Sequence, residues 1–187
     1  MSNNGYSICG IRDGGSVEHR NYNPNVINTF FSIINFKKIQ QIFSKKEILI
    51  NQYTLSNEFN DDLTKLKYDY DKESIYEPYY SFYLWLRRKG EIFLFLDTVM
   101  LDEPTDKITN LVKDQNGNVL LYHTWYARSY GKNDKHTMRI DKILNQLRSS
   151  QLEVRTSRIF KDNYFVFKKL ARKNITLLKL RVDKILS

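Results

Sequence analysis

The chain has 187 residues, of which 30 are Lys or Arg and 21 are Asp or Glu, and its formal net charge at pH 7 is +9. Hydrophobic residues make up 41% of it, including 13 Tyr and 11 Phe, which is enough for a folded core and excludes disorder throughout. A single cysteine, Cys9, excludes an internal disulfide framework and a thiolate metal site.

The first predicted feature is a polar N-terminal arm over residues 1–23. It shows no hydrophobic periodicity, and it contains Gly5, Gly10, Gly14 and Gly15, which favour turns and irregular loops. It also lacks the apolar core of a signal peptide and the Arg-rich pattern of a transit peptide. We therefore expect the protein to be intracellular, in the cytoplasm or within a virus particle.

A helix is predicted over residues 24–43. Asn23 suits the N-cap position and Pro24 suits the first turn. The side chains that follow at helical spacing are Ile27, Phe30, Phe31, Ile34, Lys38 and Ile42. Residues 45–59 are predicted to form a second, weaker helix or an extended segment.

An acidic segment over residues 60–78 comes next, and its carboxylates include Asp61, Asp62, Asp69, Asp71, Glu73 and Glu77. The sequence then predicts a short aromatic helix over residues 79–89 that ends at Gly90. Residues 91–101 predict a buried strand. The longest apolar run of the chain lies within it, at residues 92–96, and is too short to span a membrane.

A β-hairpin is predicted around Asn116-Gly117, because this dipeptide lies between two alternating segments and favours a tight type I′ turn. If these two residues form the turn, the numbers of paired residues sum to 233. One face of the hairpin then carries Ile108, Val112, Leu121, His123 and Trp125, and the other carries Leu111, Leu120, Tyr122 and Tyr126.

The last part of the chain is predicted to contain a helix over residues 137–149, which has an apolar stripe. Three strand-like segments follow, at residues 152–160, 164–170 and 175–183, and they predict an antiparallel meander.

The predicted fold class is therefore α+β, with N-terminal helices, a central β-hairpin, then a helix and a C-terminal antiparallel β-meander. We expect residues 24–187 to form a single α+β domain behind the arm. This domain would include the acidic segment 60–78 and a basic C-terminal part, residues 128–187.

The sign of the charge changes along the chain. Residues 1–60 contain 6 Lys or Arg and 4 Asp or Glu, residues 61–105 contain 6 and 10, and residues 106–187 contain 18 and 7. The many cations of the last third predict a positive surface, which attracts polyanions or an acidic protein face.

The first candidate site is on the predicted meander, where basic residues alternate with Tyr164, Phe165 and Phe167. Nucleic-acid surfaces combine cations for phosphates with aromatic faces for bases. In the alternative interpretation the aromatics belong to the core and the lysines keep an edge strand soluble. The residues expected to bind nucleic acid are Arg155, Arg158, Lys161, Lys168, Lys169, Arg172, Lys173, Lys179 and Arg181.

The second candidate site is the segment 122–136, which also contains Tyr126 and Lys132. Its four candidate catalytic residues are His123, Arg128, Tyr130 and His136. RNA-cleaving toxins use such side chains to align a phosphate and transfer protons, and a histidine near neutral pKa serves as acid or base. Two histidines thirteen residues apart are not a motif, however. The alternative is that His123 is a partly buried strand residue and the others line a polar loop.

The third candidate is a metal site, because Asp69, Asp71 and Glu73 alternate and would share one face of a strand. A solvated face, or a patch that docks on the basic part of a neighbouring copy, is the alternative. The sequence lacks a phosphate-binding glycine–lysine loop, a dinucleotide glycine pattern and zinc-ligand spacing. We therefore expect no cofactor and no metal.

The leading functional hypothesis is a non-enzymatic structural component of a large particle, such as a connector or collar-type protein of a phage-like virion. Its basic C-terminal part would contact nucleic acid or acidic neighbours. Its partners would be other copies of itself or neighbouring assembly proteins, with no membrane. One alternative is a small nuclease or RNase toxin that acts through the four residues of the second site. Another is a nucleic-acid-binding regulator or a ribosome-associated protein.

Overall fold

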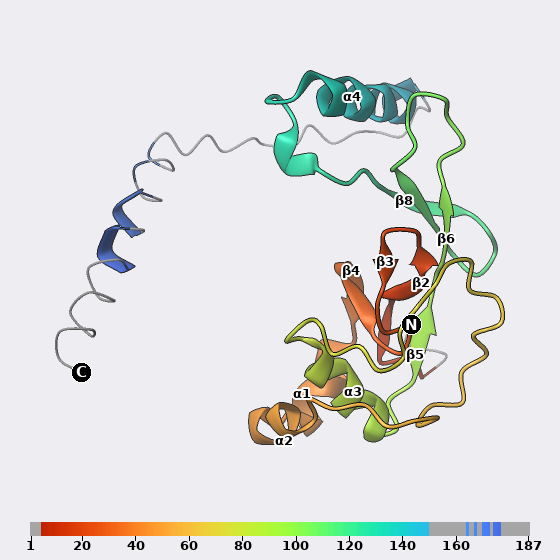
Figure 1. Ribbon diagram of the computed structural model, residues 1–187, viewed down its shortest axis with the longest axis vertical. Coiled ribbons are helices and arrows are strands. Elements are labelled where there is room, and N and C mark those ends of the chain that lie inside the picture. Colours follow the sequence, from red (N-terminus) through yellow and green to blue (C-terminus); the bar gives the residue numbers. More distant parts are fainter. Residues whose placement is uncertain (1–4, 150–163, 165–166, 168–169, 173, 177–187) are drawn as a thin grey trace. The chain divides into compact units, whose positions relative to one another are not determined.

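The structure is a computed structural model, and it describes residues 5–149, 164, 167, 170–172 and 174–176. The chain divides into two compact units, Met1–Lys142 and Ile143–Ser187. The first unit contains three β-sheets and few helices (Figure 1).

The first sheet has the strand order β4-β1-β5. Its central strand β1 (Ile8–Arg12) pairs antiparallel with β4 (Ile27–Ile34) and parallel with β5 (Phe93–Phe95). Strands β2 (Gly14–Val17) and β3 (Arg20–Asn21) form a separate two-stranded antiparallel sheet directly after β1. The N-terminal residues thus supply the centre of the fold.

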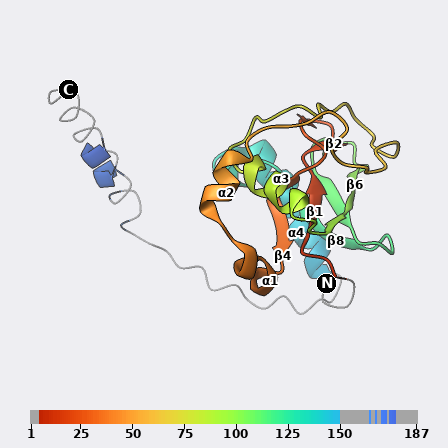
Figure 2. The same ribbon diagram turned by 90° about the horizontal axis from the view of Figure 1, so that it is seen from below.

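Three helices, α1 (Phe36–Ile42), α2 (Lys45–Ile50) and α3 (Tyr80–Arg88), gather near the first sheet (Figures 1 and 2). Together they bury a core whose members are Ile8, Val26, Ile27, Ile39, Tyr80, Tyr83, Leu84, Trp85 and Leu86. Full burial of each large apolar side chain stabilises the fold by about 1.5–3 kcal/mol, so this core holds α3 against the sheet.

The second three-stranded sheet consists of β6 (Asp97–Met100), β7 (Asn110–Lys113) and β8 (Val119–His123), all antiparallel. Only Leu96 separates β5 from β6, so the predicted strand 91–101 is two strands in different sheets. A second core joins these sheets through Cys9, Ile11, Val17, Leu96 and Val112. After the 3₁₀ helix η2 (Ala127–Ser129), helix α4 (Asp134–Ser149) begins.

The prediction of an irregular arm is wrong for residues 8–21, which form β1, β2 and β3. Ile8 and Ile11 are inaccessible to solvent. Gly10 allows β1 and β4 to approach closely, because a β-carbon there would lie 2.5 Å from Ile27 Cγ2 and 2.8 Å from the Phe31 carbonyl oxygen. Glycine composition suggested a loop, but the glycine is required by packing.

A fully buried carboxylate, Asp13, ties the N-terminal strands to α3. Arg20 donates two hydrogen bonds of 2.7 Å to it, Asn28 donates one of 2.5 Å, and Tyr79 donates one of 3.1 Å. Tyr80 also donates its hydroxyl proton to Asp13. A buried carboxylate is tolerated only when it is paired and hydrogen-bonded, and these donors meet that requirement.

The predicted helix over residues 24–43 is also wrong, because residues 27–34 form β4 and helix starts only at α1. Asn23 does not cap a helix; its side chain accepts a hydrogen bond from the backbone N–H of Asn25. Asn35 is the actual N-cap, and its side chain accepts from the N–H of Lys38. The run of β-branched and aromatic residues pairs with β1 and follows strand propensity.

The predicted hairpin forms, and away from the turn it has the predicted register, since Asn110 pairs with His123, Leu111 with Tyr122 and Val112 with Leu121. Next to the turn the register shifts by one residue, because Lys113 pairs with Val119. The turn itself differs from type I′. A type I′ turn needs positive φ at both central residues, but Asn116 does not have a positive φ, whereas Gly117 has φ +85°. Together with the hydrogen bond from Gly117 N–H to the Asp114 carbonyl, this is a type I turn followed by a left-handed glycine.

The remaining expectations have mixed outcomes. The aromatic helix before Gly90 is confirmed as α3, and the helix at 137–149 is confirmed as part of α4. The predicted C-terminal meander is wrong at the described residues of the second unit, because residues 167, 170–172 and 174–176 are helical. The rest of the predicted meander lies outside the described residues. The predicted α+β order is therefore wrong.

No helix in the described part of the chain is long and apolar enough to cross a membrane.

Candidate anion-binding site

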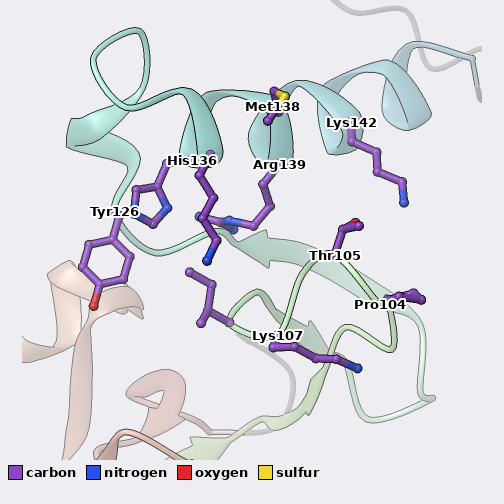
Figure 3. Close-up of a pocket in the computed structure, with 10 residues that line it drawn as sticks. Pro104, Thr105, Lys107, Tyr126, His136, Met138, Arg139 and Lys142 are labelled. Atoms are coloured by element: carbon purple, nitrogen blue, oxygen red, sulfur yellow. The ribbon is translucent and has the colours of Figure 1, made fainter.

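A cavity of about 790 Å³ lies between the first turns of α4 and the segment 104–108. In Figure 3, His136, Arg139 and Lys142 extend from α4, Pro104 and Thr105 lie on the opposite segment, and Tyr126 lies beside His136. The cavity is lined by Pro104, Thr105, Lys107, Ile108, Tyr126, Lys135, His136, Met138, Arg139 and Lys142.

Arg139 organises the wall of this cavity, and its side chain is only 5% exposed. Its guanidinium donates to Thr109 Oγ1 at 2.5 Å and to the Trp125 carbonyl oxygen at 3.0 Å, and it lies 3.4 Å from Asp106 Oδ2. The Nε atom of Arg139 is buried and has no hydrogen-bond partner. One cation thus connects α4 to the residue before β7 and to the turn after β8.

Asp106, the counter-ion of Arg139, is 3% exposed. Burial by itself raises the pKa of this carboxyl. The hydroxyl and backbone N–H of Thr109, the backbone N–H of Ile108 and the charge of Arg139 outweigh that effect, so the pKa of Asp106 lies below its usual value. Asp106 is therefore ionised at neutral pH, and it keeps Arg139 in place.

The turn that follows β8 has an unusual backbone. Trp125 and Tyr126 are consecutive non-glycine residues with φ of 44° and 52°. Each left-handed residue of this size costs of order 1–3 kcal/mol, so the turn persists only because other contacts hold it. These contacts are the bond from Trp125 Nε1 to Asn110 Oδ1, at 2.8 Å, and the bond from Arg139 to the Trp125 carbonyl.

The turn places Tyr126 against His136. The two rings stack with their centroids 4.8 Å apart and their planes inclined by 23°. Tyr126 remains 51% exposed, so part of its ring is accessible to solvent. The Nδ1 atom of His136 is buried without a hydrogen-bond partner.

Positive charge lies in the two hollows that the exposed ring lines. Lys107 and Lys135 line the cavity together with Tyr126, and Arg128 lines a neighbouring hollow that Tyr126 also lines. All three cations are exposed, and none forms an ion pair within the described residues. We call Lys107, Arg128 and Lys135 the cationic rim. Lys142 differs from them, since it pairs with Glu103.

The four residues of the predicted nuclease site lie in different surroundings. His123 stacks on Phe30 with ring centroids 3.7 Å apart, and burial lowers its pKa to about 4. Tyr130 donates its hydroxyl proton to Asp141 at 2.6 Å. His136 lines the cavity and Arg128 lines the neighbouring hollow, whereas His123 and Tyr130 line neither. His123 is thus a neutral, partly buried strand residue, which is the alternative interpretation from the sequence.

Most of the basic residues predicted to bind nucleic acid lie outside the described residues. Arg155, Arg158, Lys161, Lys168, Lys169, Lys173, Lys179 and Arg181 belong to this group. Arg172 is described, and it is exposed and helical.

The acidic residues proposed as metal ligands do not form a metal site. The Asp71 side chain accepts a hydrogen bond from the backbone N–H of Glu73, which is a turn and not a strand. Among the described residues, no three His, Cys, Asp or Glu side chains come together as a metal site would require.

Sequence reasoning did not identify Lys107, Arg139 or Lys142 as site residues. For Arg139 a signal was present. It precedes Ile143 by four residues and therefore shares the apolar stripe of α4, where an unpaired cation would be costly. Such a cation predicts a buried acidic partner, and Asp106 is that partner. For Lys107 no such pattern exists, because its position depends on how segment 104–108 folds.

Comparison of the chain with protein-family models, with curated proteins and with solved structures gives no match.

Proposed function

We propose that this protein is a non-enzymatic structural component of a large nucleoprotein assembly and that it contacts nucleic acid through the cationic rim. A connector or collar-type protein of a phage-like virus particle fits this description best. The proposal depends on one observation: three exposed cations, without ion pairs in the described chain, line the same two hollows as an exposed tyrosine. Cations of this kind bind phosphates, and an aromatic face stacks on bases.

The wider proposal covers location and partners. The protein acts inside a cell, in the cytoplasm or within a virus particle, and binds other copies of itself or neighbouring assembly proteins. The basic residues between 155 and 181 extend the contact with nucleic acid.

The direct test measures fluorescence anisotropy of labelled single-stranded DNA and RNA with the full chain. We expect affinity to fall when Lys107, Arg128 and Lys135 are all replaced by Gln. The matched control replaces Lys37, Lys45 and Lys46, which are exposed on or beside α1 and α2. The proposal fails if wild type does not bind, or if both triple variants lose the same affinity.

A nuclease is the second candidate, and one observation favours it. His136 stacks on Tyr126 in the cavity wall and has an Nδ1 atom without a partner. Incubation of the full chain with single- and double-stranded RNA and DNA separates the two proposals. We expect binding without cleavage. Cleavage that is lost in His136→Asn and retained in His19→Asn would replace the structural role by an enzymatic one.

Sedimentation distinguishes an assembly component from a regulator. An assembly component forms complexes that grow with protein concentration on long nucleic acid, because neighbouring copies contact one another. Sedimentation velocity over a hundredfold concentration range should therefore show species of increasing size. A single monomeric complex at every concentration would favour a regulator.

A further inference from the structure

The cavity beside α4 combines features of a site for an aromatic anion. Its volume of about 790 Å³ lies in the range of small-molecule sites. Ile108 and Met138 give it apolar wall, and Tyr126 gives it an exposed aromatic ring. Lys107 and Lys135 provide the positive charge, without an ion-pair partner among the described residues.

Two polar atoms in the same wall lack hydrogen-bond partners. They are Nε of Arg139, on a side chain that is only 5% exposed, and Nδ1 of His136. Leaving a buried donor unsatisfied costs of order 1–3 kcal/mol, and charged groups cost more. Among the described residues, the only other such side-chain atom is Nδ1 of His123. Two of three unsatisfied atoms therefore belong to one cavity, where an incoming acceptor could pair with them.

The strained turn at Trp125 and Tyr126 supports the same conclusion. Backbone strain of this kind concentrates at sites where a side chain must be held in one position. Here the strain holds the Tyr126 ring against His136 and at the mouth of the cavity. Two consecutive left-handed residues are usual only where glycine, asparagine or aspartate occupies the turn, and here they are a tryptophan and a tyrosine.

We propose that this cavity binds one nucleotide unit, with its base stacked on Tyr126 and its phosphate held by Lys107 and Lys135. A phosphate or base oxygen, after a small shift of the covering side chains, accepts the hydrogen bond of Arg139 Nε. This inference rests on the proposed function, because it names the chemical group that the cationic rim recognises. The nucleotide is either free or part of a single strand, and the chemistry of recognition is the same for both.

The experiment is isothermal titration calorimetry of the full chain with adenosine 5′-monophosphate, uridine 5′-monophosphate, inorganic phosphate and deca-thymidylate. Tyr126→Ala retains a β-carbon and therefore the same backbone strain, and we expect it to weaken nucleotide binding about 10-fold. Tyr126→Phe should retain wild-type affinity. Tyr70→Ala removes an exposed ring elsewhere and is the matched control.

A second pair of variants tests the phosphate contact. Lys107→Gln should weaken binding of the nucleotides and leave binding of the nucleoside adenosine unchanged, whereas Lys46→Gln should change neither. Circular dichroism and the thermal midpoint of each variant establish that it is folded. If a folded Lys107→Gln variant loses as much affinity for adenosine as for the nucleotides, the assigned position of the phosphate is wrong.

The outcomes separate this inference from the proposed function. Binding of mononucleotides that Tyr126→Ala weakens supports a site for free nucleotides, and binding of deca-thymidylate alone with the same sensitivity supports a site for a single strand. If deca-thymidylate binds and Tyr126→Ala affects it no more than Tyr70→Ala, the nucleotide site is wrong and the proposed function stands. If only mononucleotides bind, the site stands and the proposed function fails. If nothing binds, both fail.

Discussion

Arg139 shows how one buried cation can shape a site at the residue scale. It connects Asp106, Thr109 and the carbonyl of Trp125, and it therefore fixes both the first turns of α4 and the strained turn that carries Tyr126. The cationic rim depends on this connection, because Lys135 and Tyr126 lie on the two elements that Arg139 joins. The exposed cations thereby lie beside an aromatic ring whose position is fixed.

Replacement of Arg139 by Met should be strongly destabilising. It leaves Asp106 buried without its counter-ion, and breaking a buried pair in this way costs about 3–5 kcal/mol of unfolding free energy. Urea denaturation followed by circular dichroism measures the loss. Arg148→Met, at the exposed last turn of α4, is the control and should change stability by less than about 0.5 kcal/mol. Equal effects of the two substitutions would contradict the role given to Arg139.

His123 should make stability depend on pH. Burial lowers its pKa to about 4 from the ordinary 6.5, so between these values the unfolded chain binds a proton that the folded chain does not. The unfolding free energy therefore falls as the pH is lowered from 6.5 towards 4. After allowance for solvent screening of a half-buried ring, the contribution lost between pH 7 and pH 5 is about 1 kcal/mol.

The variant His123→Phe keeps an aromatic ring against Phe30 and removes the titrating group. Urea unfolding at pH 7 and pH 5 should show a smaller loss of stability for His123→Phe than for wild type. His19→Asn changes an exposed histidine and should retain the wild-type difference. If all three proteins lose the same stability, His123 does not carry this pH dependence.

At the scale of elements, residues 51–79 form a long connection between α2 and α3 with no helix or strand of their own. Asp61 anchors this connection by accepting hydrogen bonds from Arg12, at 2.8 Å, and from Arg87, at 2.6 Å. Burial raises the pKa of Asp61, but the hydrogen bonds from Arg87 and Arg12 outweigh it and the pKa is lowered overall. Unanchored connections of this length are uncommon in folded domains.

Asp61→Asn should loosen this connection without unfolding the core. It removes the negative charge between two arginines, and we expect faster amide hydrogen exchange over residues 55–68 while exchange of β1 is unchanged. Asp62→Asn is the neighbouring control, because Asp62 is exposed and bonds only to Thr64 among the contacts described. Equal exchange in the two variants would show that Asp61 is not the anchor.

How much of the fold follows from the sequence differs from one element to another. The hairpin register and α3 could be predicted, because alternation, Asn116-Gly117 and Gly90 are local signals. Strand β4 could not, since Ile27, Phe30, Phe31 and Ile34 satisfy a helical spacing equally well. These residues form a strand because they pair with β1. Strand β1 was not predicted either, because its glycine, which packing requires, was interpreted as a sign of a loop.

The candidate site was predictable only in part. The segment 122–136 was singled out from its composition, and the structure places Arg128 and His136 of it beside hollows on the surface. The wall residues Lys107 and Lys142 come from a different segment and from a later turn of α4. Their proximity is a result of tertiary folding, which no local pattern in those segments encodes.

At the scale of the whole molecule, the ion pairs follow the uneven distribution of charge along the sequence. The acidic residues Asp61 and Glu58 pair with Arg12, Arg87 and Arg88, all from the first half of the chain. Among cations between residues 106 and 149, only Arg139 and Lys142 form ion pairs within the described residues. The cations left without one are Lys107, Lys113, Arg128, Lys132, Lys135 and Arg148.

This division matters because the positive charge of the last third is not neutralised by the acidic segment in the part of the chain that the structure describes. A field from several unpaired cations attracts a polyanion and makes the association depend on salt. Paired cations elsewhere, such as Arg87, should contribute little to that dependence.

The most direct test of the account is the salt dependence of affinity for a single-stranded oligonucleotide, measured by anisotropy from 50 to 300 mM salt. Each phosphate contact contributes a log–log slope of about −0.7, so the triple Gln variant of the cationic rim should have a slope shallower than wild type by up to about 2. The triple variant of Lys37, Lys45 and Lys46 should keep the wild-type slope. An unchanged slope in the rim variant, or an equal change in both, would contradict the claim that the cationic rim binds nucleic acid.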